Sequence, residues 1–296
     1  MAVAQRIAIT GASGLIGSAL VGYLKSEGHT VQRLVRRATV APDEIRWDPK
    51  TGYVDIDALR GVDAVIHLAG VGVGDKRWTK RYKSEILNSR LLGTTTIANA
   101  VAEVKPQVFI SASAIGWYGD SGNRAVVESD SVGHDFLAAV CREWESAADL
   151  AGDVRTVKLR TGLVLNPTGG ALGRMLPLFR FGLGGKLGSG KQWWSWITLH
   201  DVVRAIVFTL EKQISGPVNL TSPNPVTNQE FTSALARAMK RPALFPAPAI
   251  ALKIALGGFS SEVLGSKKVM PNALTDAGFK WDYPHISTAL QALVEQ

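Results

Sequence analysis

Short apolar runs alternate with longer amphipathic segments through the first half of the chain. The apolar runs have the length of β-strands and occupy residues 6–10, 64–68 and 108–113, and further strands are predicted at 30–35 and 155–160. Helical spacing of apolar positions falls between them, at residues 14–27, 80–104 and 135–150. Strands that alternate with helices predict a parallel sheet with helices on both faces. The pattern therefore predicts an α/β fold built on a doubly wound parallel sheet.

The pattern changes after Thr161. Residues 169–190 are rich in glycine and basic residues, and three tryptophans follow them. A helix at 201–211 and a short strand at 218–221 then resume the first pattern. We therefore predict a sheet domain and a smaller C-terminal substrate lobe. The sheet domain comprises residues 1–165 with 201–221 returning to it, and the lobe comprises 166–200 and 222–296.

Two local features of the second half give further expectations. Residues 243–259 form the most apolar stretch, interrupted by Pro246, Pro248 and Lys253, and we expect a buried loop and helix there. Asp201 stands at the start of a predicted helix and is expected to cap it, with Thr198 as the alternative cap.

Composition narrows the class of protein. With 46% hydrophobic and 20% charged residues among 296, the chain has the make-up of a folded globular protein. Cys141 is the only cysteine, which excludes an intramolecular disulfide and a cysteine-rich zinc site. Residues 1–5 lead directly into the apolar run at Ile7, and no apolar run reaches about 18 residues. We therefore expect no signal peptide, no membrane partner and a cytoplasmic location.

The formal net charge of the chain is +8. Such a balance is found in nucleic-acid-binding proteins and also in proteins whose positive field attracts an anionic cofactor or substrate. The basic residues are spread along the chain except at 76–83, so we expect no nucleic-acid partner. Within that segment Arg77, Trp78, Arg81 and Lys83 either bind an anionic substrate or form a solvated helix face.

A glycine motif follows the first predicted strand. Gly11 permits a tight turn, Gly14 lets the backbone approach a pyrophosphate, and Gly17 lets the next helix pack closely on the strand. The helix N-terminus offers free N–H groups and a positive dipole end to phosphates. A strand, this motif and a helix in that order indicate a Rossmann-type dinucleotide-binding domain. The predicted cofactor contacts are Gly11, Ser13, Gly14, Leu15, Ile16 and Gly17.

The end of the second strand indicates which dinucleotide is bound. NAD-binding domains place an acidic residue there to hold the ribose 2′-hydroxyl, but no acid occurs between Thr30 and Val40. Arginines stand at this place instead, at positions 33, 36 and 37. An arginine can pair with a 2′-phosphate through charge-assisted hydrogen bonds, so we predict NADP as the cofactor, with Arg36 and Arg37 as contacts.

Several motifs together resemble one protein family. The glycine motif, His67 to Gly70, Ser111 to Ser113 and Tyr118-Gly119 resemble the extended short-chain dehydrogenase/reductase superfamily. Further segments are typical of its atypical epimerase-like branch, often labelled sugar-nucleotide epimerase, which has a small C-terminal domain of unknown function. These segments are Arg77 to Thr79, Ser89-Arg90, Gly93-Thr94, Arg160 to Leu165, Gly184 to Trp193 and Gly216 to Pro225.

The resemblance covers nearly the whole chain and implies an NADP-binding fold, with Leu68, Ala69 and Gly70 as further cofactor contacts. It names no substrate. The chain departs from the branch at Thr198 and His200, and at Gly258-Phe259, which weakens any transfer of substrate contacts to those segments.

The usual proton-transfer pair of the superfamily is missing. Ordinary members place a tyrosine four residues before a lysine, and the lysine lowers the tyrosine pKa. Alignment of the helix on Glu145 puts Leu137 and Cys141 at these positions, and neither suits the task. Ser113 and Tyr118 are the remaining catalytic candidates. The alternatives are that Ser113 is a strand-end hydroxyl bonded to backbone and that Tyr118 is a packing residue.

Two functional hypotheses follow. The first is an NADP-dependent oxidoreductase or epimerase that acts on a small anionic or sugar-like substrate. The second is a regulatory or sensor protein that binds NADP and has lost catalysis.

We expect no metal, because no histidine and acid group lies at metal-ligand spacing. Trp193, Trp194 and Trp196 form a pocket wall, pack in the core, or make a homodimer contact.

Overall fold

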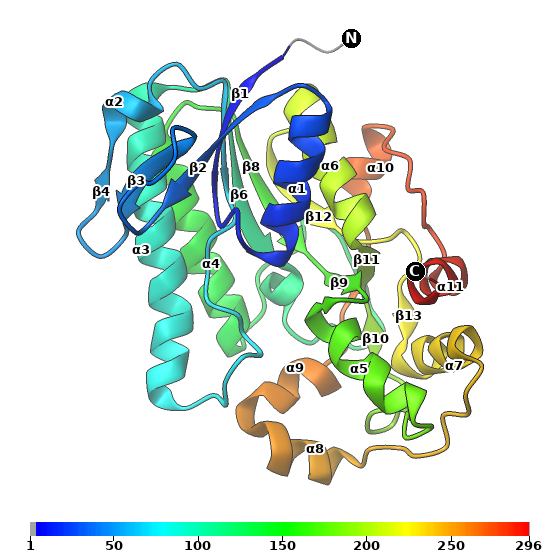
Figure 1. Ribbon diagram of the computed structural model, residues 1–296. Helices are drawn as coiled ribbons and strands as arrows, with labels where there is room; N and C mark the ends of the chain where they lie inside the picture. The colour runs from blue at the N-terminus through cyan, green and yellow to red at the C-terminus, as the bar shows by residue number, and fades with distance from the viewer. Residues whose placement is uncertain (1–3, 296) are drawn as a thin grey trace.

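A parallel β-sheet forms the centre of the protein, whose computed structural model describes residues 4–295 (Figure 1). Its strand order is β12-β8-β6-β5-β1-β2-β3-β4, and all neighbours are parallel except β3 and β4. The strands are β1 (Arg6–Thr10), β2 (Thr30–Val35), β3 (Glu44–Asp48), β4 (Tyr53–Val54), β5 (Ala64–His67), β6 (Val108–Ala114), β8 (Thr156–Thr161) and β12 (Gly216–Leu220).

Helices cover both faces of this sheet (Figure 1). One face carries α1 (Leu15–Ser26) and α6 (Leu199–Glu211), and the other carries α3 (Lys80–Val104) and α4 (Phe136–Ala148). Side chains alternate along β1, so that Ile7 and Ile9 pack against the α1 side while Ala8 packs against the α3 side. The sequence-based prediction of a doubly wound α/β fold is therefore confirmed. A short helix, α2 (Ile56–Leu59), follows β4.

A second hydrophobic core lies beside the sheet. It contains Leu172, Trp196, Phe231 and Leu290 and is enclosed by α5 (Gly170–Arg180), α7 (Asn228–Met239) and α11 (Ile286–Val294). Two two-stranded pairs contribute to it: β9 (Leu163–Asn166) with β11 (Trp196–Thr198), and β10 (Trp193–Trp194) with β13 (Val226–Thr227). A third pair, β7 (Ala125–Val126) with β14 (Lys268–Val269), packs with Tyr118 in a separate small cluster.

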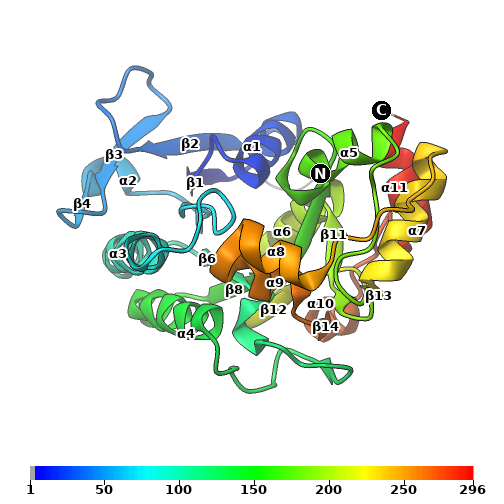
Figure 2. The ribbon, with the colours of Figure 1, turned by 90° about the horizontal axis from the view of Figure 1, so that it is seen from below.

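The remaining helices link this lobe to the sheet. α8 (Ala249–Leu256), a 3₁₀ turn at Gly257–Phe259 and α9 (Ser260–Leu264) lie below the sheet in Figure 1 and in front of it in Figure 2, which is seen from below. The helix α10 (Asn272–Asp276) precedes Phe279, and Leu274 and Phe279 pack in the core of the sheet. The 3₁₀ turns Ile115–Tyr118 and Asp149–Ala151 follow β6 and α4. None of the helices within residues 4–295 is long and apolar enough to cross a bilayer.

The structure decides three expectations drawn from the second half of the sequence: the first is wrong, and in the other two an alternative holds, the cap at Thr198 and the packing of Trp196 in the core. Residues 243–259 are not buried: Ile250 is 73% exposed, Ile254 is 68% exposed, and α8 has no buried residue because no element within residues 4–295 covers its apolar face. Asp201 does not cap α6, since the Thr198 hydroxyl accepts the bond from the Asp201 N–H at 3.1 Å. The three tryptophans do not share one wall, because Trp196 lies in the lobe core while the Trp193 ring faces Lys268.

Candidate functional site

The glycine turn between β1 and α1 has different requirements at its three glycines. Gly11 has a φ of +69°, and a Cβ there would stand 2.8 Å from the carbonyl carbon of Leu68. A Cβ at Gly17 would collide with the carbonyl oxygen of Gly11. A Cβ at Gly14 would meet only that same oxygen, at 3.3 Å, and no other atom within 4 Å. The fold therefore requires Gly11 and Gly17, whereas Gly14 keeps an open space outside the turn.

The loop after β5 is tied to the end of β1 by one hydroxyl. Thr10 Oγ1 accepts hydrogen bonds from the backbone N–H of Leu68 at 3.1 Å and of Ala69 at 3.3 Å. Its own proton then faces His67 Nδ1, 2.7 Å away, which makes Nδ1 the unprotonated ring nitrogen. Complete burial lowers the pKa of His67 to about 3, so the ring is neutral. Residues 68–70 are thus held against the glycine turn.

The start of α1 is open to an anion. Gly14 is its N-cap residue, and no side chain caps the helix. The N–H groups of the first turn and the positive end of the helix dipole therefore remain for a phosphate. Together with the open space at Gly14, this arrangement fits the diphosphate of a dinucleotide.

The arginines at the end of β2 differ in their partners. Arg33 binds Asp43 through two hydrogen bonds of 2.8 and 3.0 Å. Arg37 binds Glu44 through two hydrogen bonds of 2.6 and 2.9 Å, and with the Val40 N–H it lowers the pKa of Glu44 to about 2. Arg36 is exposed, and within residues 4–295 it forms neither an ion pair nor a side-chain hydrogen bond. Arg36 is therefore the arginine most available to a 2′-phosphate.

Ser113, at the end of β6, belongs to a buried charged network. Its hydroxyl donates a 2.7 Å hydrogen bond to Glu145 of α4. The Glu145 carboxylate also accepts two hydrogen bonds from Arg160 of β8, at 2.8 and 2.9 Å. Glu145 is 5% and Arg160 2% exposed. The pair satisfies both buried charges and fixes the direction of the Ser113 proton, while the hydroxyl oxygen can still accept a hydrogen bond.

Tyr118 lies on the far side of the same network. Its hydroxyl donates to Asn219 Oδ1 at 2.7 Å and accepts from Arg160 Nη1 at 3.0 Å. The side chain is buried, and this burial raises its pKa to about 12. The geometry argues against the proton-donor role that the sequence predicts for Tyr118, because protein groups already occupy its hydroxyl. It supports the alternative of a packing residue.

Leu137 and Cys141 face the turn that follows β6. A Cβ at Gly116 would stand 3.2 Å from Leu137 Cβ and 3.5 Å from Cys141 Sγ, and that thiol lies 3.6 Å from the Ala114 carbonyl oxygen. Burial, followed by the charge of Glu145, raises the pKa of Cys141 to about 12. The thiol is therefore protonated at neutral pH, and neither residue can take over the proton transfer of a tyrosine–lysine pair.

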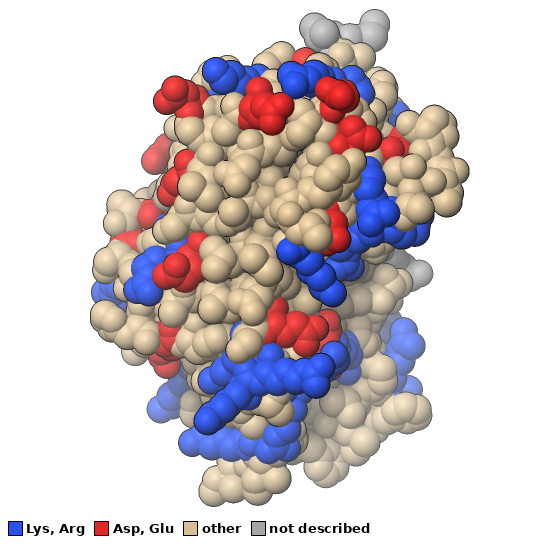
Figure 3. Space-filling model, turned by 90° about the vertical axis from the view of Figure 1, so that its left-hand side faces the viewer, with Lys and Arg blue, Asp and Glu red and all other residues tan. Residues whose placement is uncertain are grey.

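The basic segment at 76–83 lies where α3 begins, near the carboxyl ends of the strands. Figure 3 shows lysine and arginine side chains gathered at this end of the molecule. Two aromatic rings pack against Trp78 and limit its contact with a ligand. The ring centroid of Phe136 is 5.2 Å away in an edge-on arrangement, and that of Phe259 of the lobe is 5.7 Å away. Its role is to join the loop before α3 to α4 and the lobe.

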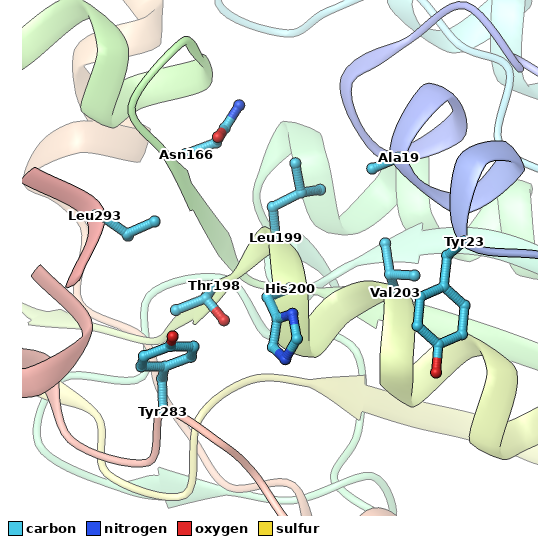
Figure 4. A pocket seen from close by; sticks show the side chains of 9 residues that line it. All are labelled: Ala19, Tyr23, Asn166, Thr198, Leu199, His200, Val203, Tyr283 and Leu293. Atoms are coloured by element: carbon cyan, nitrogen blue, oxygen red, sulfur yellow. The ribbon is translucent and has the colours of Figure 1, made fainter. Parts of the chain in front are cut away.

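A cavity of about 340 Å³ lies elsewhere, between α1, α6 and α11 (Figure 4). Its polar side chains include His200, whose Nε2 lies 2.7 Å from Asp282. Asp201 lies beneath them and accepts hydrogen bonds from the backbone N–H groups of Asp282 and Tyr283. Arg204 neutralises both carboxylates. These groups fasten the segment before α11 to α6, and the cavity is separate from the glycine turn.

Comparison with known proteins finds two family models along the chain. The model of the "NAD dependent epimerase/dehydratase family" matches residues 7–221, and that of the "Domain of unknown function (DUF1731)" matches residues 247–293. The Epimerase family protein Mb2239 of Mycobacterium bovis is 46% identical over 96% of both chains. The Epimerase family protein SDR39U1 of Bos taurus is 36% identical over 98% of this chain and 100% of that protein.

A solved structure shows the same fold throughout. The human epimerase family protein SDR39U1, crystallised with NADPH, superposes with a TM-score of 0.91 and is 31% identical, covering 98% of this chain and 99% of that chain. The likeness therefore includes the sheet domain and the lobe. It agrees with the family resemblance that the sequence motifs indicate.

Proposed function

The chain belongs to the NAD dependent epimerase/dehydratase family, and from this premise we propose that it is an NADP(H)-dependent oxidoreductase or epimerase. Its substrate is a small anionic or sugar-like molecule. The observation that carries the cofactor choice is Arg36, which is exposed at the end of β2 without an ion-pair partner in the described chain. The NADPH bound to the human relative supports the same choice.

The residues present fit such a cofactor. Gly14 and the uncapped start of α1 would hold the diphosphate, Arg36 the 2′-phosphate, and Leu68, Ala69 and Gly70 the nucleoside side of the crevice. When bound, the nicotinamide supplies a hydride acceptor or donor. The chain itself must then place a substrate oxygen and exclude water from it.

Ser113 is the residue best placed to orient that oxygen. Its proton is directed to Glu145, so its oxygen can accept a hydrogen bond from a substrate hydroxyl. Arg160 holds the Glu145 side chain in one position through two hydrogen bonds, and Glu145 in turn holds Ser113 in one rotamer. We propose Ser113 as a substrate-binding residue of the reaction and Glu145 as the residue that positions it.

One feature favours a second function, an NADP-binding regulatory or sensor protein without catalysis. The thiol of Cys141 and the phenol of Tyr118 both have pKa values of about 12, and Leu137 cannot ionise. None of these three residues near the end of β6 can therefore exchange a proton efficiently at neutral pH.

Turnover with a compound panel separates the two functions. Carbonyl compounds and nucleotide sugars are incubated with the protein and NADPH or NADP⁺, while the absorbance of NADPH and the formation of epimers by chromatography are followed. The enzyme function predicts turnover of at least one compound that disappears in Ser113→Ala and persists in the exposed control Arg142→Gln. Tight NADPH binding with no turnover of any compound would contradict it and support the regulatory function.

A further inference from the structure

Arg90 of α3 is a buried arginine without an acidic partner. Its side chain is 9% exposed, and among residues 4–295 no carboxylate lies within the 4.0 Å of an ion pair. Buried arginines usually pair with a carboxylate. Arg160, which is 2% exposed, does so, because it binds the Glu145 carboxylate with two hydrogen bonds. An unpaired buried charge costs several kcal/mol, on the order of the loss seen when one partner of a buried pair is removed.

Arg90 lies between the loop that follows β5 and the helix α4. Its Cζ is 3.6 Å from the position of a Cβ at Gly70, in the loop that follows β5. On its other side the guanidinium stacks on Trp144 of α4, 4.8 Å from the ring centroid. Its charge also reaches Cys141, whose pKa it lowers against the larger effect of burial. Arg90 therefore lies close to the carboxyl ends of β5 and β6.

The guanidinium retains hydrogen-bonding capacity toward a ligand. One nitrogen, Nη1, donates to the Ile86 carbonyl oxygen at 3.1 Å. Within the described chain no other acceptor takes a hydrogen bond from this side chain. Its other nitrogens are not among the fully buried polar atoms that lack a partner, so they retain some exposure. The remaining N–H groups thus reach accessible space. A planar guanidinium with free donors matches the geometry of a carboxylate or a phosphate.

We propose that Arg90 binds an anionic group of the substrate, a carboxylate or a phosphate, beside the reacting end of the cofactor. The proposal rests on the proposed function and names the substrate class that the site accepts. The bound anion then pairs with the Arg90 guanidinium, which has no carboxylate partner within the described chain. The basic segment at 76–83, which includes the first turn of α3 and lies at the same end of the sheet, adds a positive field that draws anions toward Arg90.

The same chemistry could come from a phosphate of the cofactor itself. The start of α1 and Arg36 already provide for the diphosphate and the 2′-phosphate, and Arg90 belongs to neither element. The substrate is therefore the favoured source, and the two sources predict different behaviour of an Arg90 variant toward NADPH.

Calorimetry with inorganic phosphate as the probe tests the proposal. The native protein, Arg90→Gln and Arg90→Lys are saturated with NADP⁺, so that the cofactor sites are filled, and titrated with phosphate at constant ionic strength. The control is Arg142→Gln, an exposed arginine of α4 that pairs only with Glu143. We expect one saturable site in the native protein and the control, a loss of tenfold or more in affinity in Arg90→Gln, and partial rescue in Arg90→Lys.

Thermal unfolding separates a binding role from a structural one. We expect phosphate to raise the Tm of the NADP⁺-saturated native protein and not that of Arg90→Gln, and we expect the variant without phosphate to be at least as stable as the native protein. Equal phosphate affinity in both proteins would overturn the proposal, as would a lower Tm of Arg90→Gln without any change in phosphate binding.

NADPH titrations of the same variants identify the source of the anion. If Arg90→Gln loses tenfold or more in NADPH affinity while phosphate binding to the NADP⁺ complex is unchanged, Arg90 serves the cofactor and the proposal fails while the proposed function stands. If native protein binds no NADPH, the proposed function fails, and the phosphate titration of the cofactor-free protein still decides the role of Arg90.

Discussion

The Ser113 hydroxyl donates to a Glu145 carboxylate oxygen 2.7 Å away, across 32 residues of sequence. Arg160 holds the same carboxylate through two further hydrogen bonds. The best catalytic candidate of the chain is therefore positioned by a buried ion pair rather than by a neighbouring tyrosine and lysine.

This relationship predicts unequal costs of removing its members. Glu145→Gln leaves Arg160 buried without a full charge partner and should lower the free energy of unfolding by about 3–5 kcal/mol. Ser113→Ala removes one hydrogen bond and should cost about 1 kcal/mol, since the carboxylate keeps Arg160. Urea denaturation of both variants measures the difference. Equal losses would show that the ion pair does not organise the site.

Tyr118→Phe should mainly affect stability. The variant leaves Asn219 Oδ1 without its partner, while Arg160 Nη1 keeps the Glu128 carbonyl oxygen at 3.0 Å, and a loss of about 1–3 kcal/mol is expected. NADPH affinity should not change. The sequence alone predicts a different result, a fall in turnover of about 10²–10⁴-fold from loss of an acid or base. That fall, observed with unchanged stability, would restore the proton-donor role of Tyr118.

His67 should make the stability of the protein depend on pH above the range where carboxylates titrate. Its folded pKa of about 3 lies below the ordinary value of 6.5, so below pH 6.5 the unfolded state binds a proton that the folded state does not. Stability is therefore complete above pH 6.5 and is lost as the pH falls from there toward 3.

The expected slope approaches about 1.4 kcal/mol per pH unit as the pH falls below 6.5. Chemical denaturation between pH 6.5 and 5 should show this loss in the native protein and a much smaller one in His67→Gln. The comparison uses slopes, so it is independent of any constant loss of stability in the variant. Parallel curves for the two proteins would refute a neutral buried His67.

Two glycine substitutions three residues apart should separate folding from binding. Gly17→Ala places a methyl group against the Gly11 carbonyl oxygen and should destabilise the fold. Gly14→Ala meets only one atom, at 3.3 Å, and should fold while losing NADPH affinity, because the methyl group enters the space left for the diphosphate. Thermal unfolding and calorimetry on both variants provide the test. A folded Gly14→Ala protein with native NADPH affinity would contradict the cofactor assignment.

The sequence predicts β1, β5 and β6 well because they are buried on both faces and form nearly continuous apolar runs. In β2 and β8 polar residues stand between the apolar ones, and these strands too lie at nearly their predicted positions. The strand β3 was missed, since Glu44, Arg46 and Asp48 alternate with only two apolar residues. It is placed by pairing with β2 and by the ion pairs of Arg33 and Arg37, which are contacts between strands and leave no periodic signal.

The site was predicted where its chemistry is local and missed where it depends on the fold. The glycine turn and the end of β2 lie within single short segments. The partners of Ser113 and Tyr118 lie 32 and 101 residues away, so no spacing in the sequence connects them. Likewise, the apolar composition of residues 243–259 predicts burial, but composition does not say whether another element covers the face of α8.

Cofactor preference tests the central claim most directly. Calorimetry should show that the native protein binds NADPH at least tenfold more tightly than NADH. Arg36→Ala should lose about 1–3 kcal/mol of NADPH binding and little of NADH binding. Arg37→Ala should lose less, because Arg37 is already held by Glu44 through two hydrogen bonds. Equal affinity of the native protein for NADPH and NADH would contradict the account.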